Sequence, residues 1–270
     1  MPTDDARATP ILPGRDFVKQ DERTPFVAGL ARARVAAYPP GEFVEQESFM
    51  TAGQIHELAS RAGIGPGVSV LDVCCGIAGP GRFITRELGC RYLGVDLSSS
   101  ALDIARERAG ALPCRFEVAQ VPPLPPGPFD VVLLLETMLA FPEKQPLLDE
   151  ISAALTDGGR FAFTLEEGLP LTEQERERMP DADTVWLTPL DEMLLHLERA
   201  GLVVRWRDDW SDSHRGVADS LIHAFTADAA NIAADIGQQA LDELLAAHRL
   251  WSDWMRDGRV RKIAFVAEKS

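Results

Sequence analysis

The stretch VSVLDVCCGIAGPG, residues 68–81, starts with an apolar strand pattern and ends as a glycine-rich turn. From there to about residue 207, segments with strand character alternate with segments of helical periodicity. This alternation predicts a parallel sheet with helices on both faces, because parallel strands must be joined by crossover connections. Ligands of such doubly wound sheets bind at the carboxyl ends of the strands. The glycine-rich turn follows one of these ends and is therefore the first candidate site.

The predicted segments also divide the chain. Residues 1–15 are polar and punctuated by proline and glycine, which predicts a flexible N-terminus. Residues 16–60 are predicted to form an N-terminal helical lid, and residues 61–210 the doubly wound core. Residues 211–256 are predicted to form a second helical part of the lid, and residues 257–270 to return as the final strand of the core sheet.

Charge and cysteine content exclude several classes of protein. The chain has 27 Lys and Arg against 42 Asp and Glu, a net charge of −15, which argues against a nucleic-acid partner and against an anionic membrane surface. The N-terminus MPTDDARATP has no apolar signal region and no apolar run is long enough to span a bilayer, so a cytoplasmic protein without a membrane partner is expected. Its four cysteines lack metal-site spacing, so no metal is expected and the thiols are predicted to be reduced.

The glycine spacing limits what the turn can hold. The pattern Gly76-x-x-Gly79-x-Gly81 does not match the GxGxxG of dinucleotide-binding folds, so an NAD-dependent oxidoreductase is the less favoured enzyme class. The alternative is a purely structural strand-to-helix turn that binds no ligand. Asp96 ends the next predicted strand, 24 residues after Asp72, where a carboxylate can accept hydrogen bonds from both hydroxyls of a ribose. Its alternative role is a carboxylate that stabilises the start of the following helix. Both features together favour a ribose-bearing cofactor.

Four segments in this order carry a resemblance to a known family: VLDVCCGIAGPG, YLGVDLS, FDVVLLLETM and TDGGRFAFT. The chain resembles the class I S-adenosylmethionine-dependent methyltransferases, and is similar to the branch that acts on small molecules and natural products. The resemblance implies a Rossmann-like, seven-stranded, mostly parallel sheet in the α/β class, with helices on both faces, an antiparallel last strand and a helical lid. It also implies S-adenosyl-L-methionine as the cofactor.

The cofactor site that the resemblance implies departs from the family pattern at three positions. Cys74 and Ala78 stand where the first motif has glycine, and we expect glycine to be needed only where φ is positive or contact is closest. Gln120 stands near the position where the family often has Asp, and its side-chain carbonyl could accept from an adenine amino group. The predicted cofactor-binding residues are Asp72, Cys74, Cys75, Gly76, Ala78, Gly79, Asp96, Leu97, Gln120, Val121 and Leu135.

Catalytic residues are harder to identify from the sequence than cofactor-binding residues. Methyl transfer mainly requires positioning, and it needs a base only if the nucleophile must lose a proton. Glu136, at the end of the apolar run 129–136, and His214, in the polar segment DDWSDSHRG, are the candidate catalytic residues. An ordinary strand-end carboxylate and a solvated loop histidine are the alternatives. Trp251 and Trp254 lie three residues apart on a predicted helix, which indicates lid packing or the wall of an acceptor pocket.

The predicted function is S-adenosylmethionine-dependent methyl transfer to a small organic acceptor, at O, N or C, in specialised metabolism. A non-methylating reaction in the same pocket, such as a cyclisation or rearrangement, and a non-catalytic binder of the cofactor remain alternatives, because a fold alone does not define a function. The predicted partners are the small-molecule acceptor and, in a homodimer, a second copy of the chain.

Overall fold

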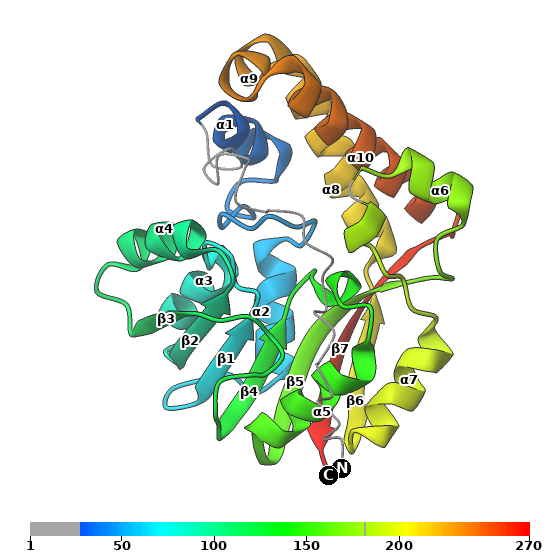
Figure 1. Ribbon diagram of the computed structural model, residues 1–270. Coiled ribbons are helices and arrows are strands. Elements are labelled where there is room, and N and C mark those ends of the chain that lie inside the picture. Colours follow the sequence, from blue (N-terminus) through cyan, green and yellow to red (C-terminus); the bar gives the residue numbers. More distant parts are fainter. Residues whose placement is uncertain (1–27, 181) are drawn as a thin grey trace, which may run out of the picture.

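The computed structural model describes residues 28–180 and 182–270, and its centre is a single seven-stranded sheet (Figure 1). The strand order is β3-β2-β1-β4-β5-β7-β6, and β7 runs antiparallel to both of its neighbours while the other pairs are parallel. The predicted fold class is thereby confirmed. The strands are β1 (Ser69–Val73), β2 (Arg91–Asp96), β3 (Cys114–Val118), β4 (Phe129–Leu134), β5 (Leu155–Glu167), β6 (Leu202–Asp209) and β7 (Arg261–Lys269).

Strand β4 shows why the centre of the sheet is apolar on both faces. Its alternate residues point to opposite sides: Val131 and Leu133 enter one core cluster, and Val132 and Leu134 enter the other. The first cluster packs against α2 (Ala52–Arg61), α3 (Gly79–Leu88) and α4 (Ser99–Ala109), the second against α5 (Lys144–Ala154) and α7 (Leu190–Arg199). Because β4 is buried on both faces, its residues form a continuous apolar run, and this run is the pattern that predicted a buried strand.

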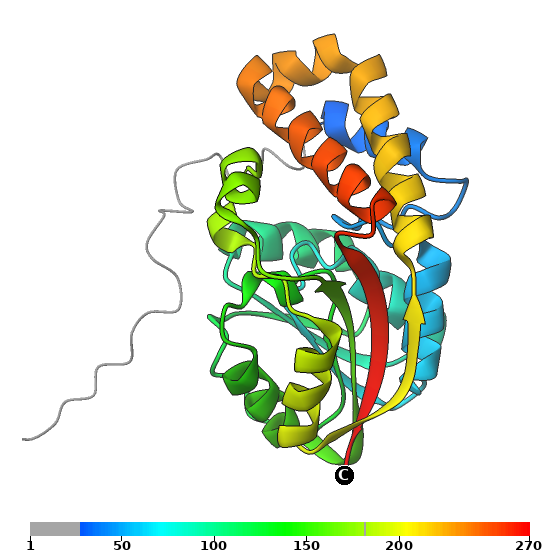
Figure 2. The ribbon, with the colours of Figure 1, turned by 90° about the vertical axis from the view of Figure 1, so that its right-hand side faces the viewer.

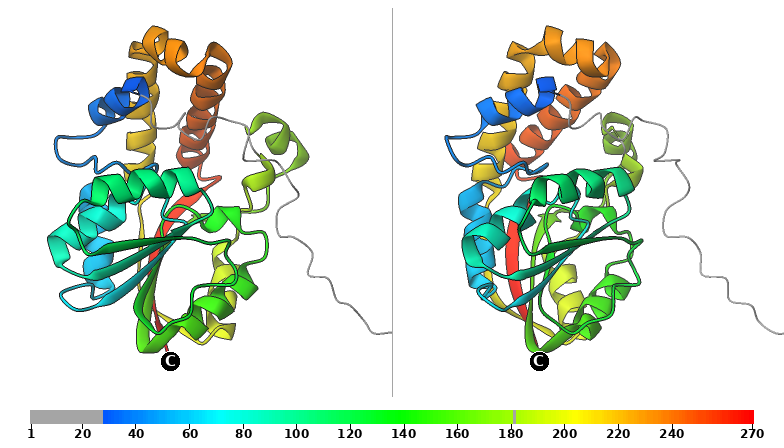
Figure 3. Two further views of the ribbon diagram at one scale, coloured as in Figure 1. Left: turned by 60° about the vertical axis from the view of Figure 1, so that its left-hand side comes forward. Right: turned by 90° about the vertical axis from the view of Figure 1, so that its left-hand side faces the viewer.

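A separate group of helices lies beyond the carboxyl ends of the parallel strands. Figures 1 and 2 show α1 (Ala28–Ala37), α8 (Ser211–Ala227), α9 (Ala229–Ile236) and α10 (Gln238–Arg256) together above the sheet. They enclose their own apolar cluster, which includes the fully buried Phe225 and Ile232. The two views of Figure 3 show the same layer over the sheet edge, with α6 (Glu173–Arg178) beside it.

Some predicted boundaries differ in the structure. The predicted strand over 129–136 ends at Leu134, which leaves Glu136 in the turn that follows. The predicted lid segment 16–60 divides, because α1 lies in the upper helical layer whereas α2 packs its buried Ile55 and Leu58 in a core cluster of the sheet. The predicted flexible residues 1–15 lie outside the described part of the chain.

Candidate cofactor and acceptor site

The turn after β1 adopts an unusual backbone that the sequence rule missed. Cys74, Gly76 and Ala78 all have positive φ, at 59°, 55° and 54°. The expectation that glycine occupies the positions with positive φ is therefore wrong for Cys74 and Ala78, where the left-handed conformation costs about 1 kcal/mol each. Two backbone hydrogen bonds hold the turn, from Cys75 N to Val95 O at 3.0 Å and from Ala78 N to Cys75 O at 2.8 Å.

The glycines of the turn are required for different physical reasons. A Cβ on Gly79 would lie 2.3 Å from the carbonyl oxygen of Val44, and one on Gly81 would lie 2.1 Å from Cζ of Tyr92. These two glycines are needed because the chain itself packs against them. At Gly76 a Cβ would meet no described atom within 4 Å. Gly76 is thus the glycine of this turn whose open side is available to a ligand.

Asp96, at the end of β2, is tied to this turn. Its Oδ2 accepts a hydrogen bond from Gly76 N at 2.8 Å, and its Oδ1 accepts one from Ser98 N at 2.9 Å. Each carboxylate oxygen keeps a further lone pair, so the partly exposed carboxylate can still accept from two ligand hydroxyls. Leu97 is 54% exposed beside it, and the exposed Gln120 follows Ala119, whose amide bonds to the Asp96 carbonyl at 3.0 Å.

Asp72 lies in β1, directly before the turn, and its surroundings affect its protonation. The carboxyl is 3% exposed and accepts a 2.5 Å hydrogen bond from Tyr92 Oη. Burial raises the pKa of Asp72 to about 7, although the bond from Tyr92 opposes this rise. Burial also raises the pKa of the Cys74 and Cys75 thiols, so both stay protonated packing groups.

The remaining predicted cofactor residues lie at the sheet edge beside the turn. Cys74 and Val121 pack against one core cluster, and Cys75 and Leu135 against the other. All four are partly exposed, which suits residues that would line a cofactor.

The two candidate catalytic residues come together in a second, buried cluster. His214 lies in the first turn of α8 and is fully buried, so the predicted polar loop is wrong at this position. Its Nδ1 is 3.8 Å from Glu136 Oε2, which is too long for a hydrogen bond. Lys262 Nζ lies 3.0 Å from Glu136 Oε2 and 2.7 Å from Glu166 Oε1.

Lys262 and Glu166 were not identified from the sequence. They face each other across the β5–β7 pair, where Glu166 follows the apolar run of β5 and Lys262 precedes that of β7. A lysine near the start of the apolar run RKIAFVAEK, and a Glu at the end of FTLEE, were the available signals. Only strand pairing brings these two positions together and to Glu136.

The charge states within this cluster follow from its burial. Burial, followed by the positive charge of Lys262, lowers the pKa of His214 to about 3, so its imidazole is neutral at ordinary pH. Burial also acts to lower the pKa of Lys262, but the carboxylates of Glu136 and Glu166 outweigh it and the pKa is raised. The ammonium group therefore stays charged.

Aromatic rings surround the ammonium group. Lys262 Nζ lies 5.4 Å from the ring centre of Phe49 and 5.3 Å from that of Trp251. Trp251 thus reaches this cluster, whereas Trp254 packs in another apolar cluster with Leu250 and Val260.

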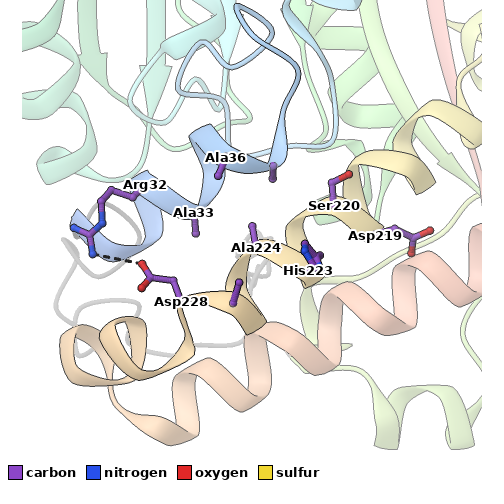
Figure 4. A pocket seen from close by; sticks show the side chains of 10 residues that line it. Arg32, Ala33, Ala36, Asp219, Ser220, His223, Ala224 and Asp228 are labelled. Atoms are coloured by element: carbon purple, nitrogen blue, oxygen red, sulfur yellow. Dashed lines mark hydrogen bonds and ion pairs between the residues drawn. The ribbon is translucent and has the colours of Figure 1, made fainter.

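The helical layer above the sheet contains a cavity of its own, shown in Figure 4. Its volume is about 780 Å³, and it lies between α1 and α8. Asp72, Asp96 and Glu136 are not among its lining residues, so it is separate from the site at the sheet edge. The lining residues are Arg32, Ala33, Ala36, Ala37, Asp219, Ser220, His223, Ala224, Ala227 and Asp228.

Two further findings concern metal sites and membrane-spanning helices in the described residues. Within residues 28–180 and 182–270, His, Cys, Asp and Glu side chains form no group of three that could hold a metal ion. In the same part of the chain, no helix is both long and apolar enough to cross a bilayer.

Comparison with known proteins shows which proteins this chain is similar to. Residues 70–159 match the model of a methyltransferase domain family. A sterol 24-C-methyltransferase of Eremothecium gossypii is 32% identical over 155 residues, which is 53% of this chain and 42% of that protein. The methyltransferase GfsG of Streptomyces halstedii is 27% identical over 182 residues, which is 63% of this chain and 65% of that protein. The chain spans less than two thirds of either relative's length.

Solved structures share the fold. A cyclopropane synthase of Mycobacterium tuberculosis superposes with a TM-score of 0.77 at 14% identity, over 92% of this chain and 96% of that one. A phosphoethanolamine N-methyltransferase of Haemonchus contortus, solved with S-adenosyl-L-methionine, gives 0.74 at 21% identity, over 92% of this chain and 58% of that one. The motifs, the sheet and the methyltransferase domain matched over residues 70–159 together support the predicted class, the class I S-adenosylmethionine-dependent methyltransferases. The Haemonchus contortus enzyme was solved with S-adenosyl-L-methionine, which supports the predicted cofactor.

Proposed function

We propose that the protein transfers a methyl group from S-adenosyl-L-methionine to a small organic acceptor, at O, N or C. The observation that carries the proposal is the pairing of the open face of Gly76 with the Asp96 carboxylate, which keeps free lone pairs. The bound cofactor would supply the electrophilic methyl group. The relatives are named as methyltransferases of sterols and of phosphoethanolamine, which supports a small acceptor.

We assign the cofactor contacts to the turn and to the ends of the neighbouring strands. Asp96 would accept from the ribose hydroxyls, and the exposed Leu97 and Gln120 would flank the adenine. The turn over residues 72–79 would contact the methionine part, and Val121 and Leu135 would close the sides. Family likeness and position at the sheet edge support these assignments.

The protein's own contribution to the reaction would be positioning and the exclusion of water. If the acceptor must lose a proton, Glu136 Oε1 is the atom to receive it, because this oxygen has no partner within the described chain. His214 would orient the acceptor as a neutral hydrogen-bonding group, since its low pKa makes it a weak base.

We propose that α1 and α8–α10 act as a lid over this edge of the sheet. They lie beyond the carboxyl ends of the strands (Figure 1). The turn follows β1 and Glu136 follows β4, at these same strand ends. Lid opening would then admit the acceptor and release the product.

A non-methylating reaction is the second candidate. A 4+2 cyclase, SpnF, has the same fold, with a TM-score of 0.67 and 21% identity. The fold is therefore compatible with chemistry other than methyl transfer.

A labelled-methyl experiment distinguishes the candidates. The protein is incubated with S-adenosylmethionine that carries a deuterated methyl group and with a small-molecule library, and products are read by mass spectrometry. Methyl transfer predicts a product with the label and a slower rate in Glu136→Gln and His214→Ala at unchanged cofactor affinity. A product without label would support the second candidate, and a full rate in both variants would leave positioning alone as the mechanism.

Four further expectations remain part of the proposal. A role in specialised metabolism rests on the family resemblance, and a cytoplasmic location stays a prediction. A homodimer is tested by light scattering during size-exclusion chromatography. Binding to nucleic acid is not expected at a net charge of −15.

A further inference from the structure

We propose that the buried cluster of Glu136, Glu166, Lys262 and His214 is a subsite for a protonated amine of the acceptor, an inference that rests on the proposed function. The four side chains come from the turn after β4, the end of β5, the start of β7 and the first turn of α8. Their exposed fractions are 8%, 0%, 4% and 0%, so the cluster is removed from water.

The charges in this cluster do not balance. The two carboxylates of Glu136 and Glu166 face the single ammonium group of Lys262, and His214 is neutral. When both carboxyl groups are ionised, one negative charge is in excess in a buried position, where an uncompensated charge is costly. A ligand with one positive charge would bring the cluster to neutrality, whereas a carboxylate ligand would be repelled.

The hydrogen-bond count favours the same ligand. Within the described chain, Glu136 Oε1, Glu166 Oε2 and both ring nitrogens of His214 are buried and have no partner. Ionised carboxylate oxygens only accept, and a neutral imidazole has one accepting nitrogen. The unpartnered atoms thus offer three acceptors and one donor. A primary ammonium group brings three N–H donors, whereas an alcohol brings one O–H.

The walls of this subsite also suit a cation. The rings of Phe49 and Trp251 lie over the ammonium group of Lys262, and the ring of Phe49 lies 6.4 Å from that of His214. Aromatic faces attract cations electrostatically, and the attraction grows when water is excluded. Phe49 precedes α2 and Trp251 lies on α10, so movement of the lid would open the subsite to the acceptor.

The test is a binding panel on the full chain saturated with S-adenosylhomocysteine. Primary amines of increasing size are titrated calorimetrically beside the alcohol and the carboxylate of the same carbon skeleton, for example benzylamine, benzyl alcohol and benzoate. At least one amine is expected to bind at least tenfold more tightly than its alcohol. A panel in which no amine exceeds its alcohol overturns the proposal without the need for any variant.

Variants then locate the amine. Glu166→Gln and Glu136→Gln each remove the excess charge and are expected to weaken amine binding at least tenfold. Glu268→Gln is the matched control, because Glu268 lies at the other end of β7 and pairs with Arg205 at the surface. Equal amine binding in all folded variants would place the amine elsewhere and contradict the proposal. If S-adenosylhomocysteine itself fails to bind the wild type, the proposed function fails instead.

Discussion

The backbone amide of Gly76 donates a 2.8 Å hydrogen bond to Oδ2 of Asp96. This bond joins the turn after β1 to the end of β2, so the two motifs recognised in the sequence form one structural unit. It also aligns the open face of Gly76 with the carboxylate that would hold a ribose. The site is therefore defined by the bond between the motifs as much as by either motif.

Replacement of Asp96 should weaken the cofactor complex. We expect Asp96→Ala to lose about 1.5–3 kcal/mol of S-adenosylhomocysteine binding, the range for hydrogen bonds to a charged group. Isothermal titration calorimetry measures this loss. Asp103→Ala is the control, because Asp103 is an exposed residue of the same region and pairs only with Arg106 in the described ion pairs. Equal affinities of the two variants would refute the role of Asp96.

Substitutions at the glycines of the turn should separate effects on stability from effects on cofactor binding. Gly79→Ala is expected to destabilise the protein by about 1–3 kcal/mol, because the new Cβ would meet the Val44 carbonyl oxygen at 2.3 Å. Thermal unfolding without cofactor measures this effect. Gly65→Ala, where the Cβ would enter open space, should change stability by less than about 0.5 kcal/mol.

Gly76→Ala should behave differently from Gly79→Ala. Its Cβ would meet no described atom, but it would stand in the space offered to the cofactor and at a φ of 55°. We expect a larger loss of S-adenosylhomocysteine affinity than of stability, measured by calorimetry and thermal unfolding on the same preparation. A variant that loses stability but keeps affinity would show that the open face is not the cofactor side.

Removal of the buried ammonium group of Lys262 should lower the free energy of unfolding. Lys262→Met leaves Glu136 and Glu166 facing each other without a cation, and breaking such a buried pair costs about 3–5 kcal/mol. Urea unfolding measures the change. The adjacent Arg261→Met, which removes a partly exposed ion pair with Glu167, should cost less than about 1 kcal/mol.

A compensating variant provides the internal check. Adding Glu136→Gln and Glu166→Gln to Lys262→Met removes the uncompensated charges and should recover part of the lost stability. If the triple variant is as unstable as the sum of the single changes, charge is not the cause.

Asp72 should make stability depend on pH. Its folded pKa of about 7 lies above its ordinary value of 3.8, so the folded state holds the proton more tightly than the unfolded chain. The contribution is fully present below about pH 4 and is lost as the pH rises towards 7. Relative to Asp72→Asn, the wild type should lose about 1 kcal/mol per pH unit in this window. Urea unfolding at pH 4, 5, 6 and 7 measures the difference, and a constant difference would contradict the raised pKa.

Most of the fold was accessible from the sequence because local patterns carry it. The alternating segments predicted the sheet, and the apolar run of β4 predicted a strand buried on both faces. The predicted span of β7, RKIAFVAEK, agrees with the observed Arg261–Lys269. These features depend on residue periodicity, which is visible in a linear sequence.

The sequence by itself also determined the positions of the two candidate cofactor motifs, since strand-end turns and their carboxylates are local features. Only the tertiary structure decided which glycine faces open space, because contacts with Val44 and Tyr92 come from distant segments. It likewise decided that His214 is buried and neutral, and that Lys262 and Glu166 join Glu136. Burial and charge pairing depend on strand register and helix docking across more than 90 residues of sequence, and no local pattern encodes them.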